Sequence, residues 1–261
     1  MVKNIYLNLE VINNVGYLTL NRPKFANALN LEFTVELLSA LKSLKENQDV
    51  RAILLCAEGP IFCAGVELSY IRDQGKKSSD ALQVLSDHLH QAIITLAEMP
   101  KPVVCMVSGV AAGAGLGLAL ACDLVISGEK SRFTTAFTTA GLSPDSAVSW
   151  FLPRVIGYRR AKELLLTARM VNSTEALALG LVDRIVSADS LADVASAEAL
   201  KMANGPTKAY GLVKKLLDQS FQTDLHSQMA QEARMIVDQA TSPEGEEGMN
   251  AFFEKRPANF H

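Results

Sequence analysis

A lone carboxylate stands out in the stretch from Ala136 to Trp150. Asp145 follows Ser143 and Pro144, and apolar residues flank it on both sides. Serine favours the N-cap of a helix and proline its first position, so this pattern predicts a helix start with Asp145 in the first turn. Two interpretations follow: the carboxylate complements the helix dipole at the surface, or it faces a pocket and transfers protons.

Two glycine-containing turns each follow a predicted buried strand. The first runs from Cys63 to Leu68, and the second runs from Gly113 to Gly117. Glycine lets the backbone approach a ligand closely, and free N–H groups at a helix start face negative charge. The second turn lacks the full G-x-G-x-x-G spacing of a dinucleotide site, which disfavours a nucleotide cofactor there. Its glycines could also serve only to allow close packing. If the two turns end neighbouring strands, one N–H from each can converge on one oxygen as an oxyanion hole.

The elements that must position these groups alternate between strands and helices. Alternating apolar residues predict a hairpin from Ile5 to Leu20, and short apolar runs predict buried parallel strands at 52–57, 103–107 and 124–127. Asn30 is expected to cap a helix that runs to about Leu44, and a second helix is expected at 81–98. The sequence therefore predicts an α/β fold with both sheet faces covered.

The remaining segments differ in composition from this pattern. The polar residues from Tyr70 to Asp80 predict a mobile insertion that could cover a site. Helical periodicity predicts further helices near 159–167, 173–179, 191–203, 206–240 and 243–253. We therefore expect an α/β core of residues 1–200 and a helical C-terminal region of residues 201–261.

Composition excludes several classes of function. The 261 residues are 49% apolar with a net charge of −3, which favours a globular protein without the basic surface that nucleic acids need. Four glycines interrupt the most apolar segment, 102–126, so a membrane helix is not expected. The four cysteines lack the C-x-x-C spacing of a metal or redox site. No secretory signal pattern is visible, so a cytoplasmic protein is expected.

Several sequence blocks, taken in order, resemble the crotonase family, also called the enoyl-CoA hydratase/isomerase family. The blocks span nearly the whole chain: Leu20–Pro23, Asn27–Asn30, Phe62–Leu68, Ser108–Gly115, Cys122–Asp123, Gly180–Val182 and Phe252–Pro257. The resemblance implies a spiral of ββα units with a helical C-terminal trimerisation region. It also implies acyl-CoA substrates and a homotrimer or a dimer of trimers.

The resemblance also implies roles for individual residues. The thioester oxygen would lie between the backbone N–H groups of Val66 and Ala114, which would stabilise enolate charge. Coenzyme A would contact two segments and the C-terminal region, through Lys24, Ala26, Ala64, Gly65, Val66, Glu67, Leu68 and Lys255. The alternative for Lys255 is a purely solvated side chain. Because coenzyme A enters as the substrate thioester, no separate cofactor and no metal are expected.

Two positions depart from the hydratases of this family. Hydratases carry two glutamates, and the matching residues here are Gly117 and Phe137, which cannot transfer protons. The segment 136–154 is instead similar to the isomerases typified by 1,2-epoxyphenylacetyl-CoA isomerase, and Δ3,Δ2-enoyl-CoA isomerases also rely on a single acid in this region. One carboxylate can take a proton from C2 and return it at C4. We therefore expect an enoyl-CoA isomerase with Asp145 as the proton shuttle.

Other activities stay open. Residues 157–164 and Asp145 also resemble 4-chlorobenzoyl-CoA dehalogenase, whose matching aspartate is a nucleophile and which has a histidine where His90 stands. His90 could then activate water in a dehalogenase or thioesterase, although that relative has tryptophan where Phe137 stands. His90 could equally be a solvent-facing or structural histidine. A hydratase-like activity and a non-catalytic acyl-CoA-binding protein are the remaining alternatives.

Overall fold

A six-stranded sheet forms the centre of the protein, and the computed structural model describes residues 5–261. Its strand order is β1-β2-β3-β4-β6-β9, in which β1 and β2 form an antiparallel hairpin and all other neighbours are parallel. The predicted hairpin and the three predicted parallel strands are confirmed. The strands are β1 (Leu7–Ile12), β2 (Val15–Leu20), β3 (Ala52–Ala57), β4 (Val103–Val107), β6 (Leu124–Gly128) and β9 (Arg184–Val186).

A smaller sheet of three strands carries the second glycine turn. Its order is β5-β7-β8, with β5 and β7 parallel and β7 and β8 antiparallel. An isolated bridge between Cys63 and Ala111 joins the first glycine turn to β5, so the two turns are neighbours. The strands are β5 (Val110–Ala112), β7 (Arg132–Thr134) and β8 (Val171–Asn172).

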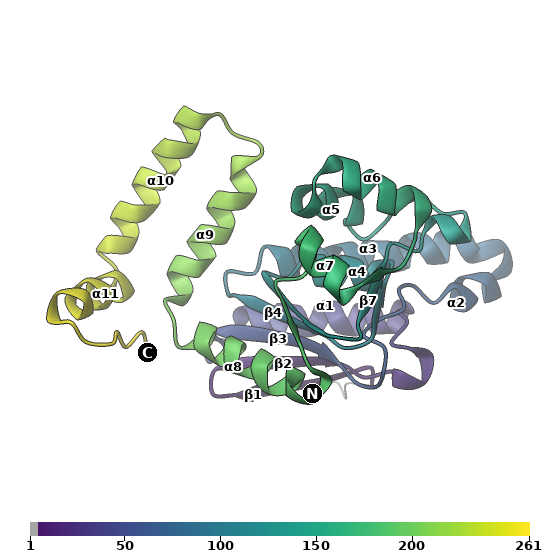
Figure 1. Ribbon diagram of the computed structural model, residues 1–261, viewed down its shortest axis with the longest axis horizontal. Helices are drawn as coiled ribbons and strands as arrows, with labels where there is room; N and C mark the ends of the chain where they lie inside the picture. Colours follow the sequence, from purple (N-terminus) through teal and green to yellow (C-terminus); the bar gives the residue numbers. More distant parts are fainter. Residues whose placement is uncertain (1–4) are drawn as a thin grey trace.

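Helices cover both faces of the large sheet (Figure 1). Successive side chains of a strand point to opposite faces, and β3 shows this division. Ile53 and Leu55 belong to the core cluster that includes α1 and α3, whereas Ala52 and Leu54 belong to the cluster with α8. These helices are α1 (Leu31–Glu46), α3 (Ser78–Ala97) and α8 (Leu191–Ala203). The predicted α/β class with two covered faces is confirmed.

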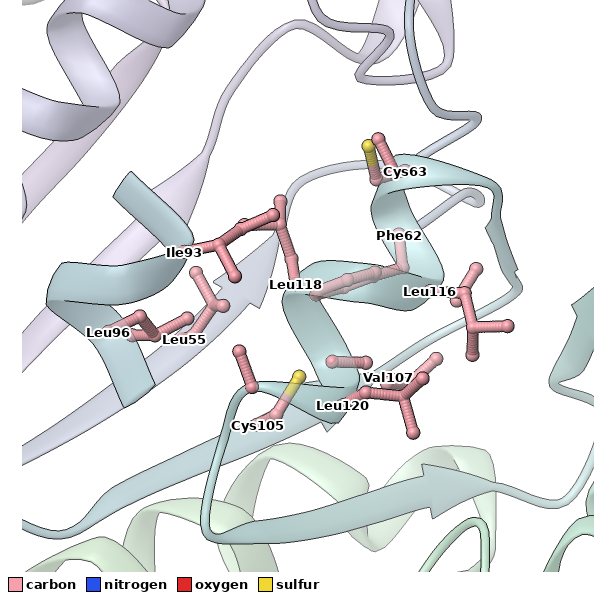
Figure 2. Packing of buried hydrophobic residues seen from close by; sticks show 14 of the residues in the cluster. Leu55, Phe62, Cys63, Ile93, Leu96, Cys105, Val107, Leu116, Leu118 and Leu120 are labelled. Atoms are coloured by element: carbon pink, nitrogen blue, oxygen red, sulfur yellow. The ribbon is translucent and has the colours of Figure 1, made fainter. Parts of the chain in front are cut away.

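Helix α4 (Ala114–Leu120) begins at the second glycine turn and is buried along its whole length. Figure 2 shows Leu116, Leu118 and Leu120 among the apolar side chains of the core, with Phe62 and Ile93 in the same cluster. Close packing of this kind leaves a helix little freedom to shift. The backbone N–H groups at the start of α4 are therefore held by a rigid element.

The segment 70–80, expected as a mobile insertion, is helical instead. It contains α2 (Leu68–Asp73), a short 3-10 helix, η2 (Gly75–Lys77), and the first residues of α3. Tyr70 and Ile71 are half-buried against the core cluster, and this packing supplies the stabilisation that the polar composition did not suggest.

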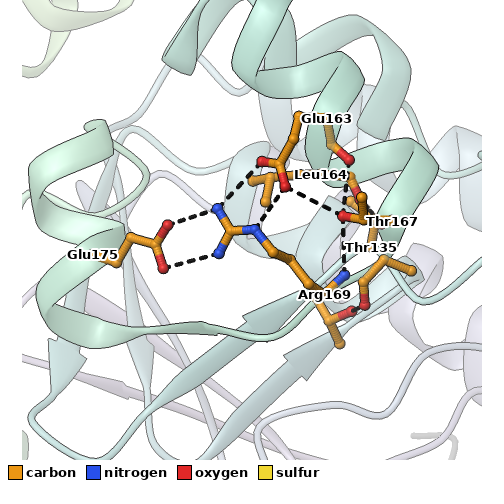
Figure 3. Close-up of polar contacts among 8 residues, drawn as sticks. Thr135, Glu163, Leu164, Thr167, Arg169 and Glu175 are labelled. Carbon is orange, nitrogen blue, oxygen red and sulfur yellow. Dashed lines mark hydrogen bonds and ion pairs between the residues drawn. The ribbon is translucent and has the colours of Figure 1, made fainter.

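Three helices follow residue 147 before β9, and polar contacts join the last two of them. They are α5 (Val148–Ile156), α6 (Tyr158–Thr167) and α7 (Ser173–Leu179). The other 3-10 helices are η1 (Pro23–Phe25), η3 (Thr138–Ala140) and η4 (Ala188–Ser190). Figure 3 shows Arg169 between Glu163 of α6 and Glu175 of α7, each at 2.7 Å. The Thr135 hydroxyl donates to the Leu164 carbonyl at 3.0 Å and thereby ties the chain before η3 to α6 (Figure 3).

Three helices form the C-terminal region: α9 (Thr207–Ser220), α10 (Leu225–Ala240) and α11 (Pro243–Glu254). The helical segment expected at 206–240 is broken into two helices, because Asp224 caps α10 by accepting from the Ser227 N–H at 3.0 Å. Figure 1 shows α9 and α10 side by side and projecting away from the sheet. Among the described residues, neither helix has a buried side chain, and Leu217, Leu225 and Ile236 are exposed.

An exposed apolar surface of this kind is typical of a subunit interface. The homotrimer or dimer of trimers stays a prediction.

The division of the chain into a core of residues 1–200 and a C-terminal region of residues 201–261 also stays a prediction, and α8 runs across this boundary. None of the described helices combines the length and apolar composition that crossing a bilayer requires.

Candidate active site

A cavity of about 250 Å³ lies between the two glycine turns, α3 and the segment 136–145. Six of the predicted site residues line it: Ala64, Gly65, Val66, Leu68, Ala114 and Asp145. Its other lining residues are mostly apolar. Within residues 5–261, Asp145 is the only ionisable side chain in this lining.

Val66 and Ala114 line this cavity, and neither backbone N–H has an acceptor within the described part of the chain. The Leu29 N–H donates to the Gly65 carbonyl at 2.8 Å, and the Glu67 N–H donates to the Leu29 carbonyl at 2.9 Å. These bonds flank Val66 and leave its N–H without a partner among residues 5–261. Ala114 is the first residue of α4, so its N–H has no intrahelical acceptor. Two residues with free backbone donors therefore line one mostly apolar cavity.

Gly65 brings the two turns into contact. Its φ is +93°, and a Cβ at this position would lie 3.0 Å from the Ala112 carbonyl oxygen and 3.3 Å from the Ala114 nitrogen. Only glycine suits this conformation and this spacing. Cys63 is the buried first residue of the first glycine turn. Burial raises the pKa of its thiol to about 12, so the thiol stays protonated and is a poor nucleophile.

Asp145 lies in a loop before α5 and not in a helix. The predicted N-cap at Ser143 and first helical position at Pro144 are wrong, because Ser146 and Ala147 adopt left-handed backbone conformations with φ near +57° and +56°. Helix α5 consequently begins at Val148. Asp145 therefore does not sit in the first turn of a helix, and the dipole interpretation loses its basis.

Two side chains of α3 contact the Asp145 carboxylate. His90 Nε2 bonds Oδ1, and the Ser86 hydroxyl donates to Oδ2 at 3.3 Å. Ser86 and His90 are four residues apart and therefore share one face of the helix. The Asp145 side chain is 31% exposed and the His90 side chain is 43% exposed. His88 turns elsewhere and bonds the Val84 carbonyl.

The sequence interpretation did not single out Ser86. The signal that could have found it is its position one helical turn before His90, on the same face. His90 itself lies behind Asp145, outside the cavity lining within the described part of the chain.

The two positions that differ from hydratases have structural roles. Gly117 is buried, and a Cβ there would lie 2.4 Å from the Ser146 carbonyl oxygen. A glutamate at 117 would therefore displace the loop that carries Asp145. Phe137 lines the cavity and adds an apolar wall.

The first segment expected to contact coenzyme A adjoins the first glycine turn. The Ala64 N–H donates to the Ala26 carbonyl at 3.0 Å, and Lys24 is exposed within η1. Glu67 is paired with Arg22 at 2.6 Å, so its charge is used within the fold. Lys24, Ala26 and Glu67 are outside the described cavity lining.

Lys255 lies at the end of α11, where it has an exposed left-handed conformation. Figure 1 places α11 at the opposite end of the molecule from α2, which adjoins the cavity. A contact between Lys255 and coenzyme A at this cavity would therefore need a neighbouring subunit.

Comparison with known proteins identifies the family. Residues 10–261 match the family model for enoyl-CoA hydratase/isomerase. This chain belongs to the enoyl-CoA hydratase/isomerase family. The chain is 36% identical to a probable enoyl-CoA hydratase from Rhodobacter capsulatus, with 97% of each chain covered. It is 35% identical to 1,2-epoxyphenylacetyl-CoA isomerase from Escherichia coli, with 96% of each chain covered.

A dehalogenase and a solved structure complete the comparison. The chain is 31% identical to 4-chlorobenzoyl coenzyme A dehalogenase-2 from an Arthrobacter species, over 96% of this chain and 91% of that one. An enoyl-CoA hydratase structure from a Polaromonas species superposes with a TM-score of 0.93 at 31% identity, covering 98% of this chain and 99% of the other. The fold is the crotonase fold, as expected.

Proposed function

We propose that this acyl-CoA enzyme is an enoyl-CoA isomerase that shifts a double bond with Asp145 as the proton shuttle. One observation carries the proposal. Among the lining residues described, Asp145 is the only ionisable side chain, and it shares the cavity with the free amides of Val66 and Ala114. The apolar remainder of the cavity suits an acyl chain.

The reaction needs few groups. The thioester oxygen accepts from the N–H groups of Val66 and Ala114, and the Asp145 carboxylate takes a proton from C2 of a 3-enoyl-CoA. The electron pair moves into the dienolate, and each backbone donor lowers such a barrier by about 2.7–4 kcal/mol. Asp145 then returns the proton at C4, which leaves the double bond between C2 and C3.

Hydration receives less support from this geometry. The hydratase glutamates correspond to Gly117 and Phe137, and the loop at Ser146 occupies the space beside Gly117. The similarities to a probable enoyl-CoA hydratase and to 1,2-epoxyphenylacetyl-CoA isomerase both support acyl-CoA chemistry, so the choice of isomerisation rests on residues 117, 137 and 145.

Substrate binding is expected to use the segments 24–26 and 64–68 for coenzyme A. Lys255 would reach the coenzyme A phosphates from a neighbouring subunit, in a homotrimer or a dimer of trimers. Removal of the Lys255 charge should then raise KM without lowering kcat.

Activity assays with 3-enoyl-CoA esters of several chain lengths test the proposal. Asp145→Asn should lower kcat by about 10²–10⁴-fold, as expected for loss of a general acid–base group. Asp87→Asn is the matched control, because Asp87 is exposed on α3 and its carboxylate hydrogen-bonds only Gln83 among the described residues. Unchanged turnover by Asp145→Asn would refute the proposal.

A second candidate is hydrolysis through an aspartyl intermediate, and the contact between His90 and Asp145 favours it. Asp145 would displace a leaving group such as chloride, and His90 would activate water to hydrolyse the resulting ester. The dehalogenase has tryptophan where Phe137 stands, and the Phe137 ring cannot donate a hydrogen bond to the nucleophile, so we rank this candidate second. A single turnover of 4-chlorobenzoyl-CoA in ¹⁸O-water should then place label in Asp145, and an unlabelled aspartate excludes it.

A further inference from the structure

The Asp145 carboxylate is held by two side chains that occupy different oxygens. His90 bonds Oδ1 and Ser86 bonds Oδ2, and both come from the same face of α3. Ser86 lines the cavity, whereas His90 does not line it within the described residues. Oδ2 is therefore the oxygen on the substrate side, and Oδ1 is turned towards His90.

A proton shuttle makes a demand on this oxygen that a simple base does not. After Asp145 takes the proton from C2, Oδ2 carries it until C4 receives it. A carboxylic acid that rotates away during this interval exposes its proton to solvent, because the Asp145 side chain is 31% exposed. An efficient shuttle therefore needs a partner that fits both protonation states of Oδ2.

A hydroxyl is such a partner, because it donates to a carboxylate and accepts from a carboxylic acid. We propose that Ser86 is a positioning residue that keeps Oδ2 of Asp145 aimed at the substrate in both protonation states. This inference rests on the proposed isomerase function. It predicts that Ser86 governs how much of the C2 proton returns at C4, beyond any effect on substrate binding.

Isomerisation of an unlabelled 3-enoyl-CoA in heavy water tests this role. The readouts are kcat, KM and the fraction of product with deuterium at C4. Ser86→Ala should lower kcat by about 2- to 10-fold, the effect of one hydrogen bond, with KM unchanged. The fraction of deuterium at C4 should rise, because the proton now exchanges with solvent before its return.

Other variants separate positioning from folding. Ser86→Thr keeps the hydroxyl and should restore the low deuterium fraction, whereas Ser86→Cys keeps the approximate size with only a weak donor and should behave like Ser86→Ala. Ser79→Ala is the matched control, because Ser79 is exposed near the start of α3 and has no contact with Asp145.

The outcomes distinguish this inference from the function on which it rests. A wild-type protein that isomerises none of the esters overturns the proposed function and this role with it. An active wild type whose Ser86→Ala and Ser86→Cys variants keep the same kcat and the same deuterium fraction overturns the role of Ser86 alone.

Discussion

Gly117 and Ser146 lie in direct contact, with room for no atom between them. A Cβ at Gly117 would stand 2.4 Å from the Ser146 carbonyl oxygen and 2.9 Å from the Ser146 Cβ. Gly117 belongs to α4, and Ser146 directly follows Asp145 in the loop before α5. A side chain at position 117 would therefore displace the loop that carries Asp145. The glycine at 117 and the position of Asp145 depend on the same contact.

This contact predicts that hydratase chemistry cannot be restored by one substitution. Gly117→Glu should show no hydration of crotonyl-CoA, and Gly117→Ala should already lower the free energy of unfolding by about 1–3 kcal/mol through overpacking. Denaturant unfolding and a hydration assay measure both effects. Gly248→Ala is the control, since a Cβ there meets Phe260 at an ordinary 3.5 Å. A stable, hydrating Gly117→Glu protein would contradict the account.

Because Gly65 contacts the second glycine turn, a substitution there should lower activity by more than backbone strain alone would. Gly65→Ala should lower kcat/KM by about 10²-fold or more, because it moves the oxyanion donors. Gly75→Ala should carry a similar backbone strain of about 1 kcal/mol without that loss. Gly75 also has a positive φ, +56°, but has open space around it. Equal effects of the two variants on kcat/KM would show that strain alone is responsible.

The Arg22–Glu67 pair should hold the segment expected to bind coenzyme A. Both side chains are more than four-fifths buried, and Arg22 also donates to the Ala28 carbonyl at 2.9 Å. Glu67→Gln should destabilise the fold by about 1–3 kcal/mol and raise KM. The exposed Arg72–Asp73 pair provides the control, and Arg72→Ala should change neither the melting temperature nor KM. An unchanged KM in Glu67→Gln would argue against this role.

The C-terminal tail should respond to acid. Hydrogen bonds from Arg256 and from the Asn259 N–H lower the pKa of Glu247 to about 2. A carboxylate with a lowered pKa stabilises the fold above its ordinary pKa of about 4.3, and the contribution is lost as the pH falls towards the lowered value. The Asn259 amide signal in NMR should titrate near pH 2. A midpoint near the ordinary value would show that the contact is not formed in solution.

Local patterns predicted much of the fold. The apolar runs that became β3 and β4 match the observed bounds, because a buried parallel strand leaves a continuous apolar signature. Asn30 caps α1 as expected, with its Oδ1 accepting from the Phe33 N–H at 3.0 Å. Such features depend on neighbours a few residues away, which the sequence states directly.

The site could be predicted partly from local chemistry and partly from the family resemblance, which implies the roles of Val66 and Ala114 and a joint role of His90 and Asp145. The Ser143–Asp145 pattern has the composition of a helix start, but Ser146 and Ala147 adopt left-handed conformations, and Ser146 lies against Gly117 of α4, a distant residue that the local pattern does not include. The contact of His90 with Asp145 joins residues 55 positions apart. Its formation depends on where α3 lies relative to the loop, which no local pattern contains.

The fate of the C2 proton tests the central claim most directly. Wild-type protein and Asp145→Asn would each be incubated with a 3-enoyl-CoA in heavy water, and NMR would follow deuterium at C2 and C4 of substrate and product. We predict that the wild type isomerises the ester and transfers most of the C2 proton to C4, with little deuterium at either position, and that Asp145→Asn gives no isomerisation above background. Isomerisation by Asp145→Asn at the wild-type rate would contradict the proposal.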